Sequence, residues 1–439
     1  MRISHLNASQ QTKHTPIGEI PAEWGCVALG KATDLLTGFP FPSDGYTDAA
    51  EGVRLLRGDN VIPGALRWTG VKRWPQSQSG ALVRYVLAPG DVVLAMDRTW
   101  VGAGLKCAVA CELDLPCLLV QRVARIRGKN DLLTCFVAQL LSTYRFSEYV
   151  RAVQTETAMP HISADQIRDF PIPLPPLPEQ RKIAEILSTW DRAIEQTEKL
   201  IAAKQRLKQG LMQQLLTGRL RFPQFGPGSS PVRRTRFGPV PTDWHYVSIG
   251  DVAAEVSDRH GGDTSIPVLS CTKYDGLVDS LTYFGKRVFS EDTSGYKLVR
   301  RGQFAYATNH IEEGSIGVLT DAEAGLVSPM YTVFRTDPYQ VDVRFLYSLL
   351  KTELYRHIFE VSTSASVDRR GSLRWNQFRT IRLALPALTE QRTIAACLGV
   401  AGQELDTMRR QLAALRQQKK GLMQKLLTGR VRVQAAATK

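Results

Sequence analysis

Polar side chains of the types that read DNA bases fall in loops that follow strand-like runs of this sequence. Arginine and lysine hydrogen-bond to guanine and asparagine to adenine, whereas most other basic contacts go to phosphate oxygens. The candidate residues are Arg57, Asp59, Asn60, Arg98, Trp100, Lys273, Tyr274, Asn309, His310, Arg369, Arg370 and Arg374. Each residue taken alone is as readily explained as an ordinary surface residue. The prediction is that the group as a whole is enriched in DNA contacts.

The charge of the chain points to a polyanionic partner. Among 439 residues, 56 Lys and Arg against 42 Asp and Glu leave a formal net charge of +14. A strongly basic protein most often binds nucleic acid; the alternative is a basic surface without such a partner. Hydrophobic residues, at 43%, supply enough apolar material for several domain cores.

Nothing in the sequence indicates a membrane or a secretory route. The chain has no run of about 18 apolar residues, and residues 1–15 lack the apolar centre of a secretory signal. Its seven cysteines, an odd number scattered along the chain, are typical of reduced thiols. We therefore expect a cytoplasmic protein.

Catalytic motifs are missing from the sequence, which favours a binding protein over an enzyme. It contains no G-x-x-x-x-G-K-[ST] phosphate loop, no G-x-G-x-x-G, no H-E-x-x-H and no G-x-S-x-G. Cys107, Cys111 and Cys117 lack the paired spacing of a zinc site, and the second half of the chain has no matching cysteines. We expect no catalytic residue, metal or cofactor in this chain.

The segments that must position the polar loops occur as two copies in the sequence. Three motifs recur in the same order, which makes chance an implausible explanation and indicates a tandem duplication. The pairs, given by their first residues, are IGEIPAEWGCVALGK at Ile17 and FGPVPTDWHYVSIGD at Phe237, LPPLPEQRKIAEIL at Leu174 and LPALTEQRTIAACL at Leu385, and GLMQQLLTGRLRF at Gly210 and GLMQKLLTGRVRV at Gly421.

Each copy ends in a long helical segment with a coiled-coil seam. Apolar residues alternate steps of four and three, which is the 3.5-residue period of paired helices. The seam residues are Ile183, Leu187, Trp190, Ile194, Thr197 and Ile201 in the first copy and Ile394, Leu398, Ala401, Leu405, Met408 and Leu412 in the second. From Glu179 to Thr217 the helix spans roughly 58 Å. Its expected partner is its own duplicate, although Lys204 and Lys208 interrupt the first seam; the alternative is two separate core helices.

The globular part of each copy is predicted to be an α+β domain. Asp91–Met96 and Tyr331–Arg335 are rich in β-forming residues, and Leu132–Thr143 and Val343–His357 have helical spacing. The expected segments are a first domain at 1–173, a first helical spacer at 174–222, a linker and second domain at 223–384, a second spacer at 385–433 and a tail at 434–439.

The repeated anchors resemble one protein family. The stretch AMPHISADQIRDFPIPLPPLPEQRKIAEIL from Ala158 to Leu187 and the LLTGR that begins at Leu215 and again at Leu426 are similar to the signature of DNA-specificity subunits of type I restriction–modification systems. The resemblance covers about residues 15–433. The second copy departs from the first at Arg369, Arg370 and Gly371, where the first has Met159, Pro160 and His161, and this prevents naming a target sequence.

The resemblance implies two α/β target-recognition domains joined by two long antiparallel coiled-coil-like helices, related by a pseudo-two-fold axis. Each domain would read half of a bipartite double-stranded DNA site, and the helices would dock two adenine methyltransferase subunits. S-adenosylmethionine would be bound by those subunits, and ATP with Mg²⁺ by a separate motor-nuclease restriction subunit. The chain itself would not be an enzyme.

Three other functions fit parts of the pattern. A stand-alone tandem DNA-binding regulator would bind duplex DNA specifically without a methyltransferase. A coiled-coil scaffold would use its charge for another polyanion and show no DNA sequence preference. An enzyme of unrecognised type is disfavoured because the middles of the two copies differ.

Overall fold

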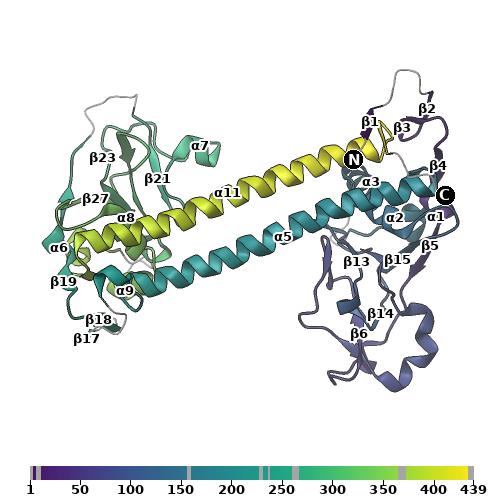
Figure 1. Cartoon of the computed structure of the whole chain (residues 1–439), viewed down its shortest axis with the longest axis horizontal. Helices are drawn as coiled ribbons and strands as arrows, with labels where there is room; N and C mark the ends of the chain where they lie inside the picture. Colours follow the sequence, from purple (N-terminus) through teal and green to yellow (C-terminus); the bar gives the residue numbers. More distant parts are fainter. Residues whose placement is uncertain are drawn as a thin grey trace. The chain divides into compact units, whose positions relative to one another are not determined.

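The computed structural model describes residues 3–5, 11–155, 160–226, 231–235, 238–259, 266–363 and 372–433. The chain forms two compact units (Figure 1): the first comprises Met1–Glu198 with Gln411–Lys439, and the second comprises Lys199–Arg410. The first unit therefore contains both chain ends. Each unit is one globular part together with half of each long helix.

The first unit is built on a four-stranded antiparallel sheet in the order β13-β10-β15-β5. Its elements are β1 (Ile3–His5), β2 (Thr12–Thr15), β3 (Gly18–Pro21), β4 (Gly25–Ala28), α1 (Leu29–Ala32), β5 (Thr33–Thr37), β6 (Val53–Leu56), β7 (Val61–Ile62), β8 (Ala65–Leu66), β9 (Arg73–Trp74), β10 (Val92–Ala95), β11 (Trp100–Val101), β12 (Gly104–Leu105), β13 (Cys107–Val109), β14 (Cys117–Leu119), β15 (Val123–Gly128), α2 (Thr134–Leu141), α3 (Tyr144–Val153), α4 (Ala164–Arg168), β16 (Pro171–Leu174), the start of α5 (Leu177–Leu215) and β29 (Val431–Val433).

The second unit repeats this sheet as β25-β24-β27-β20. Its elements are β17 (Val232–Thr235), β18 (Gly238–Pro241), β19 (His245–Ser248), α6 (Ile249–Val252), β20 (Ala253–Val256), β21 (Leu269–Thr272), β22 (Gly276–Asp279), α7 (Ser280–Phe284), β23 (Lys297–Arg300), β24 (Phe304–Ala307), η6 (Ile311–Glu313), β25 (Ile316–Val318), β26 (Ala324–Val327), β27 (Tyr331–Thr336), α8 (Val343–Leu350), α9 (Glu353–Ser362), α10 (Trp375–Phe378), β28 (Arg382–Leu385) and the start of α11 (Leu388–Leu426). The mixed α+β class and the duplication predicted from the sequence are confirmed.

The two long helices are present and run antiparallel. Each has 39 residues, and α5 begins two residues before Glu179, the position expected from the sequence. In the first unit α5 meets α11 through Asp191 with Lys419 and through Glu198 with Arg416, 2.6 Å apart. In the second unit Lys204 Nζ lies 2.6 Å from Glu404 Oε1. The residue numbers rise along one helix and fall along the other, which confirms the predicted pairing.

Half of the twelve seam residues are buried, and the other half are part-buried. Ile183, Leu187, Ile394, Leu398, Leu405 and Met408 are each at most 9% exposed. Trp190, Ile194, Ile201 and Leu412 are part-buried. Lys204, which breaks the apolar pattern, is accommodated by its ion pair with Glu404.

One predicted helix is wrong in its length. The segment Val343–His357 forms two helices, because α8 ends at Leu350 and α9 begins at Glu353. The Thr352 hydroxyl accepts a hydrogen bond from the Tyr355 N–H and so caps the second helix. Apolar spacing continued across the break and hid it from the sequence pattern.

A bidentate ion pair joins the two long helices to each globular part. In the first unit Arg432, just beyond α11, donates from Nε and Nη2 to Glu179, at the start of α5, over 2.7 and 2.8 Å. Arg432 also pairs with Glu23, and the Trp24 indole N–H donates to Glu179 over 3.0 Å. The hydrogen bonds to Glu179 and Glu23 raise the pKa of Arg432.

The second unit contains the same junction with the equivalent residues. Arg221, beyond α5, donates from Nε and Nη2 to Glu390 of α11 over 2.9 and 2.7 Å, and its Nη1 lies 2.9 Å from Asp243. The side chains of Arg221 and Glu390 are 4% and 2% exposed. The end of α5 therefore completes the second unit, and the end of α11 completes the first.

A glycine after each long helix allows this closure. Gly218 and Gly429 have φ of +71° and +70°, a left-handed conformation that glycine adopts without a Cβ clash. A Cβ at Gly218 would lie 2.5 Å from Pro241, and one at Gly429 would lie 2.4 Å from Pro21. The three repeated motifs of the sequence thus meet at one place in each unit.

Removing Arg432 should destabilise the first unit strongly. In Arg432→Met the buried Glu179 carboxylate loses its cationic partner, and breaking such a pair costs about 3–5 kcal/mol of unfolding free energy. Denaturant unfolding followed by circular dichroism measures this loss, and adding Glu179→Gln should recover part of it. Lys182→Met removes an exposed pair with Glu185 and should cost under about 1 kcal/mol. Equal losses for the two single variants would contradict the role assigned to the junction.

Candidate nucleic-acid interface

Some of the predicted DNA-reading residues lie in corresponding loops of the two repeated sheets. Arg98 follows β10, and Asn309 and His310 follow β24, the strand at the same place in the second sheet. In each unit the exit of this strand is bound to a later segment, through Ile162 N–H to Met96 O over 2.9 Å and Leu373 N–H to Thr308 O over 2.7 Å. The fold therefore presents two equivalent polar loops.

The loop of the first unit contains strained backbone. Arg98 and Arg122 have φ of +44° and +68°, unusual for residues other than glycine. Such strain persists where the surroundings enforce it and is common at functional sites. Arg122 was not among the sequence candidates, and its conformation could not have been read from the local pattern.

Three side chains around this loop form a polar cluster. His161 Nδ1 lies 2.6 Å from Asp97 Oδ1, and Arg122 Nη1 lies 3.5 Å from the same oxygen. The Asp97 carboxylate thus contacts both the His161 ring and the Arg122 guanidinium, next to Arg98 in the chain. With Arg98 counted, two guanidinium groups lie here with one carboxylate, a basic excess that suits a phosphate contact.

The turn at Arg57 and the Arg98 loop both lie close to the buried Lys106. Lys106 is 8% exposed, and burial lowers its pKa while the carboxylate of Asp59 raises it and the guanidinium of Arg98 lowers it. Arg57 and Asp59 also lie within 3.5 Å of each other. The structure thus places the Arg57 turn and the Arg98 loop near one another.

Asn60, another of the predicted residues, is buried in its own turn. Its side chain is 6% exposed, its Oδ1 accepts from Arg57 N–H, and its Nδ2 donates to Arg67 O, both over 3.0 Å. Asparagine in a turn often bonds its own backbone in this way. Asn60 shapes the turn, since its side-chain oxygen and one of its two amide hydrogens are bonded within it.

Trp100 is part-buried beneath a guanidinium. Arg151 Cζ stands 3.8 Å from the centroid of its ring, a close cation–π contact. Arg151 in turn pairs with Glu148 over 2.8 Å. The ring face is therefore already occupied, and a contact to DNA at this point would come from Arg151 as readily as from Trp100.

A part-buried lysine joins the candidate loops of the second unit. Lys351, just after α8, donates to Lys273 O over 2.8 Å and to Gly314 O over 2.7 Å, and burial lowers its pKa. The first carbonyl belongs to the β21–β22 turn and the second follows η6. Lys273 and Tyr274 are thereby held near the loop of His310. Tyr274 is 80% exposed and lies 5.3 Å from Lys273 Nζ.

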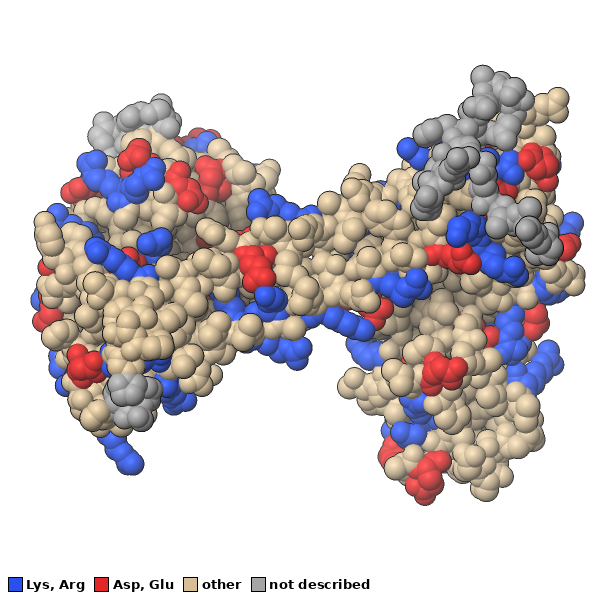
Figure 2. Space-filling view, viewed as in Figure 1, with Lys and Arg blue, Asp and Glu red and all other residues tan. Residues whose placement is uncertain are grey.

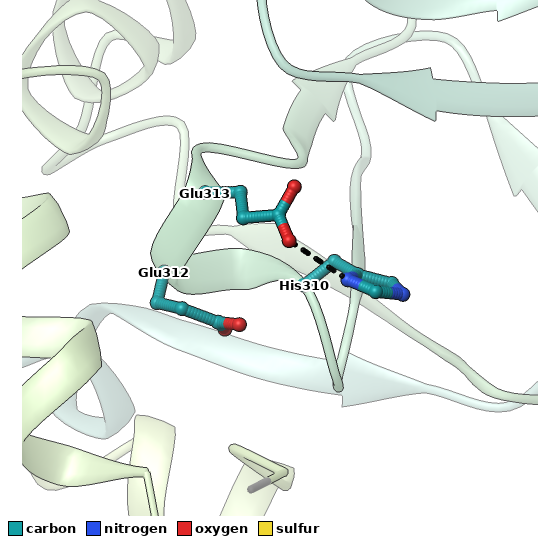
Figure 3. A group of neighbouring side chains, drawn as sticks. All are labelled: His310, Glu312 and Glu313. Carbon is teal, nitrogen blue, oxygen red and sulfur yellow. Dashed lines mark hydrogen bonds and ion pairs between the residues drawn. The ribbon is translucent and has the colours of Figure 1, made fainter. Parts of the chain in front are cut away.

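His310 stands beside two carboxylates. The carboxylate of Glu313 is turned toward the His310 ring, with 3.3 Å between Oε1 and Nδ1 (Figure 3). One ligand atom each from His310, Glu312 and Glu313 lies within 4.8 Å of the others, a grouping that could hold a cation. Because exposed acidic groups commonly carry none, the expectation of no metal stays a prediction. Their negative charge opposes a phosphate at His310.

Arg374 is an exposed cation in a segment that is hydrogen-bonded to the Asn309 loop. It precedes α10, and the hydrogen bond from Leu373 to Thr308 ties its segment to that loop. Arg369 and Arg370 lie outside the described residues and remain predictions.

The basic charge is spread over the surface. Figure 2 shows Lys and Arg on the visible face of each unit with Asp and Glu between them. Charge alone therefore does not select a binding face on this side, and the assignment depends on the loops. Within the described residues no helix is both long enough and apolar enough to span a bilayer.

The chain is similar in sequence to proteins of one kind. A protein-family model described as "Type I restriction modification DNA specificity domain" matches residues 91–205. The chain is 33% identical over 211 residues to the type I restriction enzyme MjaVIII specificity subunit of Methanocaldococcus jannaschii, covering 48% of this chain and 49% of that protein. It is 33% identical over 183 residues to the type I restriction enzyme EcoAI specificity subunit of Escherichia coli, covering 42% and 30%.

The fold is similar to a solved structure over nearly its whole length. The type I restriction–modification S subunit from M. genitalium superposes with a TM-score of 0.56 at 15% identity, covering 97% of this chain and 98% of that chain. At this identity the likeness shows the fold. The sequence matches span about half of the first relative and under a third of the second. The family resemblance predicted from the sequence is confirmed.

Replacing Arg98 or Arg374 by alanine should weaken binding of duplex DNA. Removal of one phosphate interaction should reduce the slope of log K against log salt concentration by about 0.9. Fluorescence anisotropy across a salt series measures both the affinity and the slope. Arg192→Ala, an exposed position on α5, is the matched control and should leave the slope unchanged. A slope that Arg98→Ala and Arg374→Ala leave intact would remove these loops from the interface.

Proposed function

We propose that this chain, whose residues 91–205 match the type I restriction modification DNA specificity domain, is the DNA-reading subunit of a type I restriction–modification complex. The observation that carries the proposal is the repetition of one sheet, β13-β10-β15-β5 and β25-β24-β27-β20, with a polar loop after the same strand in each copy. Two such readers suit a bipartite site in double-stranded DNA, each domain reading one half.

The long helices would set the distance between the half-sites. Each has 39 residues, which at about 1.5 Å per residue gives roughly 58 Å. Half-sites read from one face of DNA are expected about 34–36 Å apart, one helical turn. Helices of this length can keep two readers that far apart, and the bases between them would be unread.

Chemistry would belong to partner subunits. Two adenine methyltransferase subunits would dock on the helices, bring S-adenosylmethionine and flip the target base. A motor-nuclease subunit would bring ATP with Mg²⁺ and cleave. This chain would supply sequence recognition and no catalytic residue.

Deleting the gene should abolish one methylation pattern. Single-molecule sequencing of methylated adenines in the source genome should reveal a bipartite motif that disappears in the deletion strain and returns when the gene is restored. If no methylated motif depends on the gene and the chain purifies without a methyltransferase, a stand-alone DNA-binding regulator explains the protein better.

Lengthening both helices should change the gap and leave the half-sites unchanged. One heptad, inserted after Glu198 in α5 and after Arg410 in α11 where the chain passes between units, adds about 10.5 Å. That length corresponds to up to about three base pairs. The methylated motif of the variant measures the effect, and altered half-sites with an unchanged gap would contradict the spacer role.

A further inference from the structure

A basic cavity lies in the second unit against α8 and α11. It encloses about 670 Å³, and its lining includes four cations and no carboxylate among the described residues. The cations are Lys208 from α5, Lys273 from the β21–β22 turn, Arg344 from α8 and Lys351 just after it. Like charges gathered in a part-enclosed site repel each other, so an anion from outside the chain would be stabilised there.

The first unit fills the corresponding place with its own carboxylate. Lys419 is the repeat equivalent of Lys208, 211 residues later, and it pairs with Asp191. The side chain of Gln139 also donates to Asp191, over 3.2 Å. One internal carboxylate thus neutralises this lysine of the first unit.

In the second unit that carboxylate is missing from the sequence. The residue 211 positions after Asp191 is Gly402, and a Cβ built there would lie 3.2 Å from Lys208 Nζ. The lysine therefore still points at the position its partner occupies in the other copy. No ion pair of Lys208 is found among the described residues.

Two of the other cations are already engaged. Lys351 donates to backbone carbonyls of Lys273 and Gly314, and Arg344 lies 3.9 Å from Asp342. Lys208 and Lys273 are consequently the groups with charge to offer a ligand. Their ammonium groups would each donate a charge-assisted hydrogen bond to an anion seated at Gly402.

The surroundings of the cavity suit a protein partner. Val400 on α11 and Tyr274 on the opposite turn are 66% and 80% exposed, and a Cβ at Gly399 would meet no atom within 4 Å. Exposed aromatic and aliphatic side chains beside the cavity favour a protein partner, because protein interfaces are enriched in aromatic residues, whereas surfaces that bind DNA are more polar and more positively charged. The anion that fills the equivalent place in the first unit is also a carboxylate.

We propose that this cavity receives an aspartate or glutamate side chain of the methyltransferase subunit that docks on α11. The proposal rests on the proposed function and adds a specific contact to it. The partner's carboxylate would take the place that Asp191 fills in the first unit and would pair with Lys208 and Lys273. Since the first unit supplies its own carboxylate, this contact belongs to one of the two docking positions.

Filling the cavity from within should block the contact. In Gly402→Asp an internal carboxylate pairs with Lys208 as Asp191 pairs with Lys419, and Gly402→Asn is the uncharged control of nearly equal size. Calorimetric titration of the full chain with the methyltransferase subunit should show affinity at this docking position about tenfold or more weaker for Gly402→Asp than for Gly402→Asn, the size of one charged hydrogen bond. Lys208→Met should weaken the same step without adding bulk.

The same variants distinguish the other occupants. The DNA affinity of the complex at saturating methyltransferase should be unchanged in Gly402→Asp. Equal affinities of Gly402→Asp and wild type for the subunit would overturn the proposal. A fall in DNA affinity with intact subunit binding would overturn it as well, because it would assign the cavity to a DNA phosphate. A wild-type chain that binds no methyltransferase would instead contradict the proposed function itself.

Discussion

The bidentate pairs of Arg432 with Glu179 and of Arg221 with Glu390 are the contacts on which the rest of the structure depends. Each arginine follows the end of one long helix, and each glutamate starts the other. Because the partners lie 253 and 169 residues apart, the pairs hold together segments that no local element connects. A buried carboxylate that loses its arginine costs several kcal/mol, so this geometry is strongly selected over alternative packings.

This exchange of helix ends makes each core a product of both copies. The core of the first unit includes Leu426, Leu427 and Val431 from the last part of the chain, and that of the second includes Leu215 and Leu216 from α5. Neither globular part can bury its apolar surface without the helix that arrives from the other copy. In each unit the pairing of the two long helices is thus part of the core.

The two copies keep the same frame and differ in what the frame presents. Gln180 and Gln391 both tie the start of a long helix to the loop before a domain helix, accepting from the Leu133 and Asp342 N–H groups over 2.9 Å. The loops after β10 and β24, in contrast, carry an arginine in one copy and asparagine with histidine in the other. Since the loops contribute little to the junctions, their side chains can differ between the copies without disturbing the fold. In the long helices, the change from Asp191 in the first copy to Gly402 in the second removes the carboxylate that would pair with Lys208, which leaves this cation free for a partner.

Much of the architecture was determined by the sequence alone. The repeated motifs indicated the duplication, and the 3.5-residue seam indicated both long helices, because helical periodicity is a local property of the chain. The loops after the central strands could be named because strand-forming runs are also local features. Local patterns could not separate α8 from α9, because the apolar spacing of α8 continues in α9 on the other side of Lys351 and Thr352. They also gave no sign that Asn60 is buried in its own turn or that Arg98 and Arg122 have left-handed backbone. Only the tertiary structure decided that the three repeated motifs meet at one junction and that Lys208 faces a glycine. Those facts depend on contacts between residues far apart in the chain, and no window of sequence contains both partners.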